Sequence, residues 1–147
     1  MIPLIQPVVD LVRVSAPHCE IEASVSVESA MVEISHDEFE QVLLNVFLNA
    51  RDSIAEAGRI SIDVQAGVSV SGGSCLEIAI ADDGCGMVAE DRDRAFEPFF
   101  TTKPPTEGTG LGLAVVLGIV QGAGGVVTLE SAPNVGTVVH LRFACSP

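Results

Sequence analysis

The chain has 147 residues, 48% of them hydrophobic, and a formal net charge of -13 at pH 7. This length fits one globular domain, and the hydrophobic content argues against a disordered chain. The negative charge argues against nucleic-acid binding, because there is no basic stripe to displace the counterions of phosphates. A bound polyanion would have to be held locally, by backbone N–H groups or a metal ion.

Four widely spaced cysteines without a CxxC pair favour reduced thiols and argue against a zinc site. The longest apolar run, residues 110–127, contains several glycines and Gln121. It therefore predicts a buried helix followed by a glycine turn, and no insertion into a membrane. Together with the lack of a signal-peptide pattern, these features predict a cytoplasmic protein.

The first part of the chain predicts two helices and two strands. Residues 2–15 suggest a short helix or docking segment, and 19–27 alternate as a strand with Ile21, Ala23, Val25 and Val27 on one side. Residues 30–34 suggest a second short strand. A helix is predicted from His36 to Ala57, ended by Gly58, from seven apolar positions at helical spacing: Phe39, Val42, Leu43, Val46, Phe47, Ala50 and Ile54.

The second part predicts strands at 59–66 and 75–81, a short polar helix, a helix at 111–121 and a closing hairpin of 125–130 with 136–143. In the hairpin, His140 alternates with apolar neighbours and is expected to face solvent. Strands grouped around separate helices, without strict βαβ alternation, predict an α+β sandwich. We expect one domain over residues 1–147, with one mixed sheet covered by helices on one face.

Asn45 and Asn49 lie four residues apart on the long predicted helix, so they share one face, which Asp52 and Ser53 extend. Asparagine inside a helix is usually a surface residue or a satisfied core amide. Two on one stripe favour another interpretation, because an amide oxygen is a suitable ligand for Mg²⁺.

Two glycine-rich segments follow. Asp82 ends a predicted strand and precedes Gly84 and Gly86, where a ligand could approach the backbone closely. An ordinary acidic turn is the alternative; a dinucleotide fingerprint is rejected, because the following helix is short and charged. Residues 108–113 lead into a helix whose N-terminal N–H groups could bind phosphate. The single lysine, Lys103, lies outside that segment, so it is not a Walker loop.

Between these segments, residues 96–103 read FEPFFTTK, which suggests a hinge packing a mobile lid from about Glu97 to Gly108. These four elements, in this order, resemble the N, G1, F and G2 boxes of sensor histidine kinases. Gly136-Thr137 resembles the third glycine box of the same family. "NARDS" and the short lid are most similar to the nitrogen-regulator type.

The resemblance implies a Bergerat-type sandwich, mainly antiparallel, with ATP between the N-box helix and a short lid. Residue by residue, it implies a Mg²⁺ ligand at Asn49 and an acceptor for the adenine amine at Asp82. It further implies hinge positions at Gly84 and Gly86. The phosphates would be contacted under the lid, and Thr137 would help fix adenine through water. Gly110 and Gly112 would contact the phosphates, and Gly108 and Leu111 belong to the same nucleotide-binding segment. This chain has Asp52 where many relatives carry a lysine or arginine that faces the phosphates, and Lys103 is the residue expected to compensate.

The family transfers the γ-phosphoryl of ATP to a histidine on a separate dimerisation domain, from which a response regulator receiver domain takes it. Residues 1–16 resemble the end of the linker from that dimerisation domain. His36 leads directly into the N box, so it is not expected to be the acceptor. Two alternatives remain: an ATPase or serine kinase of the same superfamily, and a nucleotide-sensing scaffold. Asn45 stands where the ATPases carry a glutamate, and an amide cannot be a general base.

Overall fold

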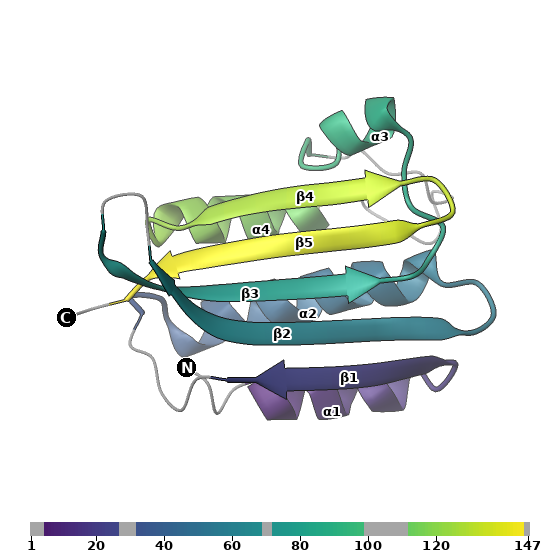
Figure 1. The fold of residues 1–147 in the computed structure, drawn as a ribbon, viewed down its shortest axis with the longest axis horizontal. Helices are drawn as coiled ribbons and strands as arrows, with labels where there is room; N and C mark the ends of the chain where they lie inside the picture. Colours follow the sequence, from purple (N-terminus) through teal and green to yellow (C-terminus); the bar gives the residue numbers. More distant parts are fainter. Residues whose placement is uncertain (1–4, 27–31, 69–71, 99–111, 146–147) are drawn as a thin grey trace.

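Five strands form one sheet, and helices cover one of its faces (Figure 1). The computed structural model describes residues 5–26, 32–68, 72–98 and 112–145. The strands lie in the order β1-β2-β3-β5-β4; β1 pairs with β2 in parallel and the other pairs are antiparallel. Their bounds are β1 Cys19–Val25, β2 Gly58–Val68, β3 Ser74–Asp82, β4 Val126–Ala132 and β5 Gly136–Ala144. The predicted α+β sandwich with a mixed, mainly antiparallel sheet is confirmed.

The covering layer consists of α1 (Ile5–Ser15), α2 (His36–Ser53) and α4 (Gly112–Gly122), all on the same face of the sheet. The short helix α3 (Ala89–Asp93) contacts β4 at the edge of the sheet. Among the described helices, none combines the length and the apolar character needed to cross a membrane.

A reciprocal cap starts α2. The Ser35 hydroxyl accepts a hydrogen bond from the Glu38 backbone N–H at 3.2 Å and donates to the Glu38 carboxylate at 3.1 Å. This arrangement satisfies one backbone donor, the Glu38 N–H, that has no partner inside the helix, and the acidic first turn suits the helix dipole. His36 is the first residue of α2 and is exposed.

The predicted extension of this helix to Ala57 is wrong, because α2 ends at Ser53. Ile54 takes an extended conformation (φ -100°, ψ 113°) and its N–H bonds the carbonyl of Arg51. Its side chain is buried in the core, so the chain turns here to keep an apolar residue out of solvent.

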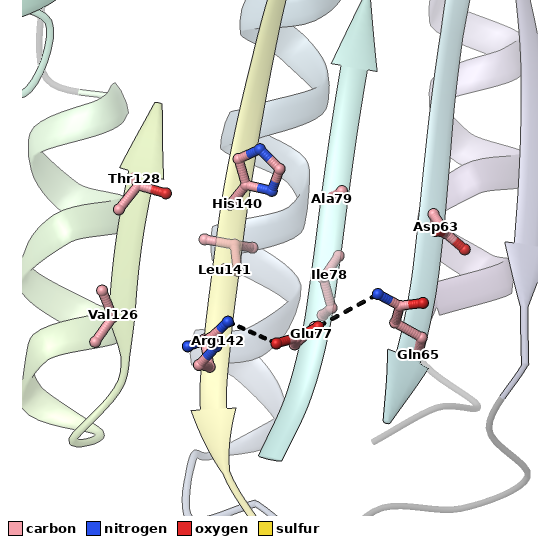
Figure 2. A pocket seen from close by; sticks show the side chains of 10 residues that line it. All are labelled: Asp63, Gln65, Glu77, Ile78, Ala79, Val126, Thr128, His140, Leu141 and Arg142. Atoms are coloured by element: carbon pink, nitrogen blue, oxygen red, sulfur yellow. Dashed lines mark hydrogen bonds and ion pairs between the residues drawn. The ribbon is translucent and has the colours of Figure 1, made fainter. Parts of the chain in front are cut away.

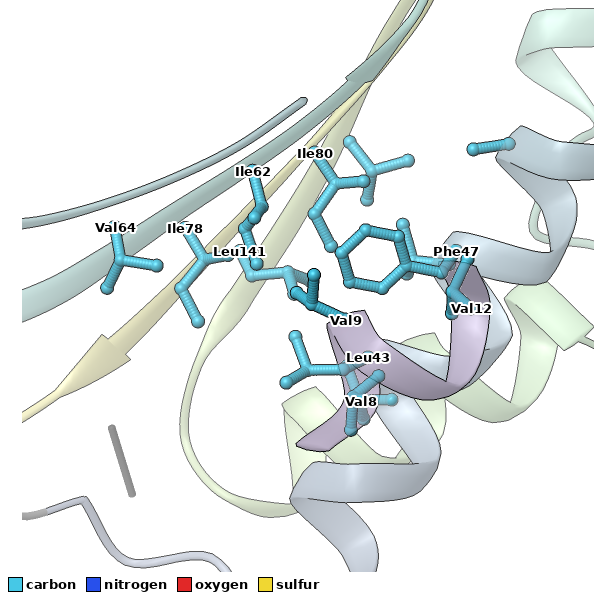
Figure 3. Packing of buried hydrophobic residues seen from close by; sticks show 14 of the residues in the cluster. Val8, Val9, Val12, Leu43, Phe47, Ile62, Val64, Ile78, Ile80 and Leu141 are labelled. Atoms are coloured by element: carbon cyan, nitrogen blue, oxygen red, sulfur yellow. The ribbon is translucent and has the colours of Figure 1, made fainter. Parts of the chain in front are cut away.

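The hydrophobic core lies between the helices and the sheet (Figure 3). The inward positions of the sheet come from its central strands, and α1 and α2 face them across the layer. Labelled members are Val8, Val9, Val12, Leu43, Phe47, Ile62, Val64, Ile78, Ile80 and Leu141. Helix α1 thus packs into the same core as the rest of the domain. The assignment of residues 1–16 to a linker stays a prediction.

The first strand differs from its predicted pattern. In β1 only Ile21 is buried, whereas Ala23 and Val25 are exposed, and Val27 lies outside the described residues. β1 is an edge strand of the sheet, and its residues after Ile21 are exposed. The short strand expected at 30–34 is reduced, in its described part, to one bridge between Val32 and Cys145.

Two glycines provide a matched test of this packing. A Cβ added at Gly118, inside α4, would meet nothing within 4 Å, whereas one at Gly125 would lie 2.5 Å from the carbonyl oxygen of Arg142. We expect Gly118→Ala to raise the free energy of unfolding by about 0.5–1 kcal/mol, because alanine has the higher helix propensity. Gly125→Ala should lower it. Urea denaturation measures both, and equal effects of the two substitutions would contradict this packing.

Candidate functional site

The carboxylate of Asp82 lies at the C-terminal end of β3, near the end of α2 (right-hand end of the sheet in Figure 1). Its Oδ1 accepts hydrogen bonds from the Ser53 hydroxyl at 3.0 Å and from the Gly84 N–H at 2.9 Å. Burial raises the pKa of Asp82 above its ordinary value. The hydrogen bonds from Gly84, Ser53 and the Thr137 backbone oppose that rise in pKa, because they favour the ionised form. Asp82 is therefore an oriented, partly desolvated acceptor.

The glycines of the acidic turn let three chain segments meet at this end of the sheet. A Cβ on Gly84 would lie 2.2 Å from the Ser53 hydroxyl oxygen. Gly86 has a positive φ of 65°, and a Cβ there would lie 1.9 Å from the Ala132 carbonyl oxygen. The Cys85 N–H also bonds the Ser53 carbonyl at 3.0 Å. The turn is therefore closely seated against both the end of α2 and the β4–β5 hairpin.

Thr137 is directly opposite Asp82 in the β3–β5 register. The Thr137 hydroxyl lies 2.8 Å from the hydroxyl of Ser131. The Ser131 hydroxyl accepts a hydrogen bond from the Met87 N–H and donates one to the Gly136 carbonyl oxygen at 3.0 Å. A serine hydroxyl has one hydrogen, so while Ser131 donates to Gly136, Thr137 must donate to Ser131. The Thr137 oxygen then keeps lone pairs for water or a ligand.

Asn49 lies one helical turn before Ser53 on α2, and the beginning of α4 lies beside it. A Cβ on Gly112, the first residue of α4, would be 3.5 Å from the Asn49 amide nitrogen and 3.8 Å from its amide oxygen. Asn45 is one further turn back, and both asparagines are half-buried. The N-terminal N–H groups of a helix favour anions, and an amide oxygen is of the kind that Mg²⁺ accepts as a ligand, so this junction brings two such features together.

Asp52 forms an ion pair with its neighbour Arg51. The Arg51 guanidinium lies 2.8 Å from the Asp52 carboxylate, and a hydrogen bond of 2.9 Å joins the same groups. The extra negative charge that Asp52 brings near the expected phosphate position is therefore offset locally.

The structure thus gathers Asn49, Asp82, Gly84, Gly86 and Gly112 at one end of the domain, with Asn45 and Thr137 adjoining them. Lys103, Gly108, Gly110 and Leu111 lie outside the described residues, as does most of the expected lid. Sequence reasoning missed Ser131, because strand β4 has no motif of its own, although Gly136-Thr137 lies in the same hairpin. The sequence did point to Ser53, because its spacing places it on the same helix face as Asn45 and Asn49.

A shallow pocket of about 380 Å³ lies elsewhere, on the open face of the sheet (Figure 2). Arg142 lies 2.6 Å from Glu77, which lies 3.3 Å from Gln65, so a polar chain crosses three strands. His140 lines this pocket, in agreement with its predicted outward orientation. No residue of the candidate site lines the pocket, and its walls are side chains of an open sheet surface, so we assign it no part in nucleotide binding.

A second polar group lies at the beginning of α2, where ligand atoms of His36, Asp37 and Glu40 come within 4.8 Å of one another. All three side chains are exposed. Asn49 lies thirteen positions after His36 along α2, which corresponds to roughly 20 Å of helix axis. His36 is therefore remote from the candidate site.

Comparison with known proteins gives consistent results. The family described as "Histidine kinase-, DNA gyrase B-, and HSP90-like ATPase" matches residues 14–147. The sensor histidine kinase ZraS of Escherichia coli (strain K12) is 37% identical over 140 residues, covering 94% of this chain and 29% of the relative. ZraS of Klebsiella oxytoca is 41% identical over 107 residues, covering 73% of this chain and 22% of the relative. The chain thus spans between about a fifth and a third of these relatives.

Solved structures agree with this relationship. The mycobacterial sensor histidine kinase MprB has a TM-score of 0.82 at 26% identity, covering 100% of this chain and 95% of that chain. Full-length ShkA in complex with AMPPNP has a TM-score of 0.80 at 28% identity, covering 98% of this chain and 30% of that chain. The chain therefore belongs to the histidine kinase-, DNA gyrase B- and HSP90-like ATPase family, as an ATP-binding catalytic domain of the sensor histidine kinase type.

Proposed function

We propose that this domain holds Mg·ATP and donates its γ-phosphoryl group to a histidine on a separate dimerisation domain. The observation that carries the proposal is the placing of Asp82 and Asn49 at the same end of the domain. Asp82 is suited to accept from the adenine amine, and Asn49 lies beside the start of α4. An acceptor for the base and a helix N-terminus for the phosphates are the two ends of an ATP site.

Asn49 fits a magnesium ligand, because its amide oxygen is neutral, hard and half-buried beside the start of α4. Mg²⁺ commonly takes one or two protein ligands and completes its shell with phosphate oxygens and water. When bound, the ion would neutralise phosphate charge. The protein itself positions the nucleotide, which is the main contribution of proteins to phosphoryl transfer.

Asn45 favours the kinase over the ATPase alternative. It lies one turn before Asn49, where the hydrolases of the superfamily carry a glutamate, and its amide cannot take a proton from water. The hydrogen-bonded orientation of Asp82 disfavours a scaffold that has lost nucleotide binding. A nucleotide-sensing scaffold would bind ATP as well, and phosphorylation of a supplied dimerisation domain distinguishes it from a kinase.

Within this proposal the partners are a histidine-bearing dimerisation domain and the receiver domain of a response regulator. We also propose a cytoplasmic location, where ATP is available. The net charge of -13 disfavours nucleic acid as a partner.

Asp82→Asn should weaken the binding of adenine nucleotides by about 1.5–3 kcal/mol, because it removes a charged acceptor and presents a mismatched donor. Calorimetry with ATP measures the effect. Asp83→Asn is the matched control: Asp83 neighbours Asp82, but its carboxylate accepts the Arg59 N–H at 2.8 Å, so its loss should matter less. The parent should also bind GTP poorly; equal affinity for GTP and ATP would contradict the role of Asp82.

Asn49→Ala should impair Mg²⁺-dependent nucleotide binding more than metal-free binding, because the amide oxygen is the proposed protein ligand of the ion. Titrations with ATP in the presence of Mg²⁺ and of EDTA separate the two. If EDTA lowers the affinities of parent and variant by the same factor, Asn49 does not bind the metal.

The chain alone should neither phosphorylate itself nor release phosphate appreciably, yet it should phosphorylate a supplied dimerisation domain that carries its histidine. His36 is remote from the site, and Asn45 cannot activate water. Incubation with γ-labelled ATP measures all three outcomes. Acid-labile label on this chain that disappears in His36→Ala would contradict the separate-acceptor mechanism, and rapid phosphate release would favour the ATPase.

A further inference from the structure

Ser53 joins the end of α2 to the acidic turn at more than one point. Its hydroxyl lies 3.0 Å from Oδ1 of Asp82, and its carbonyl accepts the N–H of Cys85 at 3.0 Å. Gly84 makes this approach possible, because any Cβ there would collide with the Ser53 hydroxyl. Ser53 is only half-exposed and twenty-nine residues from Asp82 in the chain. The contact is therefore a product of the fold, not of local sequence.

The hydroxyl of Ser53 has two possible acceptors and one hydrogen. Besides Asp82 Oδ1, the carbonyl oxygen of Ala50 lies 2.8 Å away. The N–H of Ile54 bonds Arg51, so it does not occupy the Ala50 carbonyl. The hydrogen can thus point to the carboxylate or to the end of the helix, but not to both in full strength. An ionised carboxylate is the stronger acceptor, so charge on Asp82 draws the hydroxyl toward it.

Two donors converging on one oxygen fix the plane of a carboxylate. The Gly84 N–H and the Ser53 hydroxyl both bond Oδ1, the first from the turn and the second from α2. With Oδ1 held, Oδ2 is the oxygen to which a ligand amine can donate. Without the hydroxyl, the N–H groups of Gly84 and Thr137 still bond the carboxylate, but no donor from α2 remains, so rotation about its Cβ–Cγ bond is less restrained.

We propose that Ser53 is a positioning residue that aims the Asp82 carboxylate at the amino group of the base, and so sets the preference of the site for 6-aminopurine nucleotides. The inference rests on the proposed nucleotide-binding function. Ser53 need not touch the nucleotide, because it acts through Asp82.

The test uses the 147-residue chain and two probes, ATP and the matching purine riboside triphosphate that lacks the 6-amino group. Ser53→Ala should weaken ATP by roughly tenfold, the value of a hydrogen bond to a charged group. It should change the affinity for the deamino nucleotide by less than about twofold, because that nucleotide has no amino group for Asp82 to accept from. A change of that size is what substitutions without a shared interaction produce. Ser53→Thr keeps the hydroxyl and should restore the preference for ATP.

A double-mutant cycle then assigns the effect to Asp82. In an Asp82→Asn background, Ser53→Ala should alter ATP affinity by less than about twofold, because the carboxylate that it orients is gone. Thermal melting reports whether each variant is folded. Should Ser53→Ala not fold, Ser53→Cys has nearly the same shape and a weaker donor, and it should lower ATP affinity selectively.

Three results would overturn the inference: unchanged ATP binding in Ser53→Ala, equal weakening of ATP and the deamino nucleotide, or additive effects of Ser53→Ala and Asp82→Asn. Each of these leaves ATP binding by the parent intact, so the proposed function survives them. Failure of the parent to bind ATP would overturn the proposed function and this inference together.

Discussion

The burial of one face of α2 is the constraint on which the rest of the domain depends. Phe39, Leu43 and Phe47 on that face are fully buried, and Phe39 meets Phe143 of β5 edge to face at a centroid distance of 5.9 Å. Helices α1 and α4 both pack against α2, and the sheet lies beneath it. Because the apolar stripe fixes the rotation of α2 about its axis, it also decides where Asn49 points.

The second constraint is steric and acts at the end of β3. Gly86 and Gly136 occupy positions where a Cβ would collide with backbone carbonyls of Ala132 and Asp82 respectively, each at 1.9 Å. The turn and the β4–β5 hairpin are therefore locked together through their backbones. This rigid junction holds the carboxylate of Asp82, whereas α2 supplies the second wall of the site. The geometry of the candidate site is therefore set by the packing of α2 together with the backbone contact between the acidic turn and the β4–β5 hairpin.

Much of the fold could be predicted from the chain because its periodicities are strong. Alternation in β2 and helical spacing in α2 place Ile60, Ile62 and Phe47 in the core, where the structure has them. Ends of elements were harder: α2 stops at Ser53 because burying Ile54 outweighs helix continuation, a tertiary effect that local propensity does not contain.

The candidate site, like the fold, has some features that the sequence predicts and others that depend on tertiary structure. Asn49 and Asp82 could be proposed from short motifs and family resemblance. The hydroxyl network could not, because the Ser131–Met87 bond joins residues 44 positions apart and the Ser53–Asp82 bond joins residues 29 apart. The Arg51–Asp52 pair is local, but two adjacent charges in a sequence do not reveal that they bond each other rather than solvent or a ligand. Such contacts depend on the assembled fold.

The partial burial of Asp82 also links recognition to the acid–base behaviour of the empty domain. A carboxyl whose folded-state pKa is raised binds its proton more tightly in the folded than in the unfolded chain. Its stabilising contribution is complete below the unfolded pKa and is lost as pH rises through the raised folded value. Once ionised, the group no longer makes this contribution to the stability of the empty domain. Burial of the acceptor proposed for adenine therefore lowers the stability of the domain without ligand, and ligand binding offsets this loss of stability by mass action.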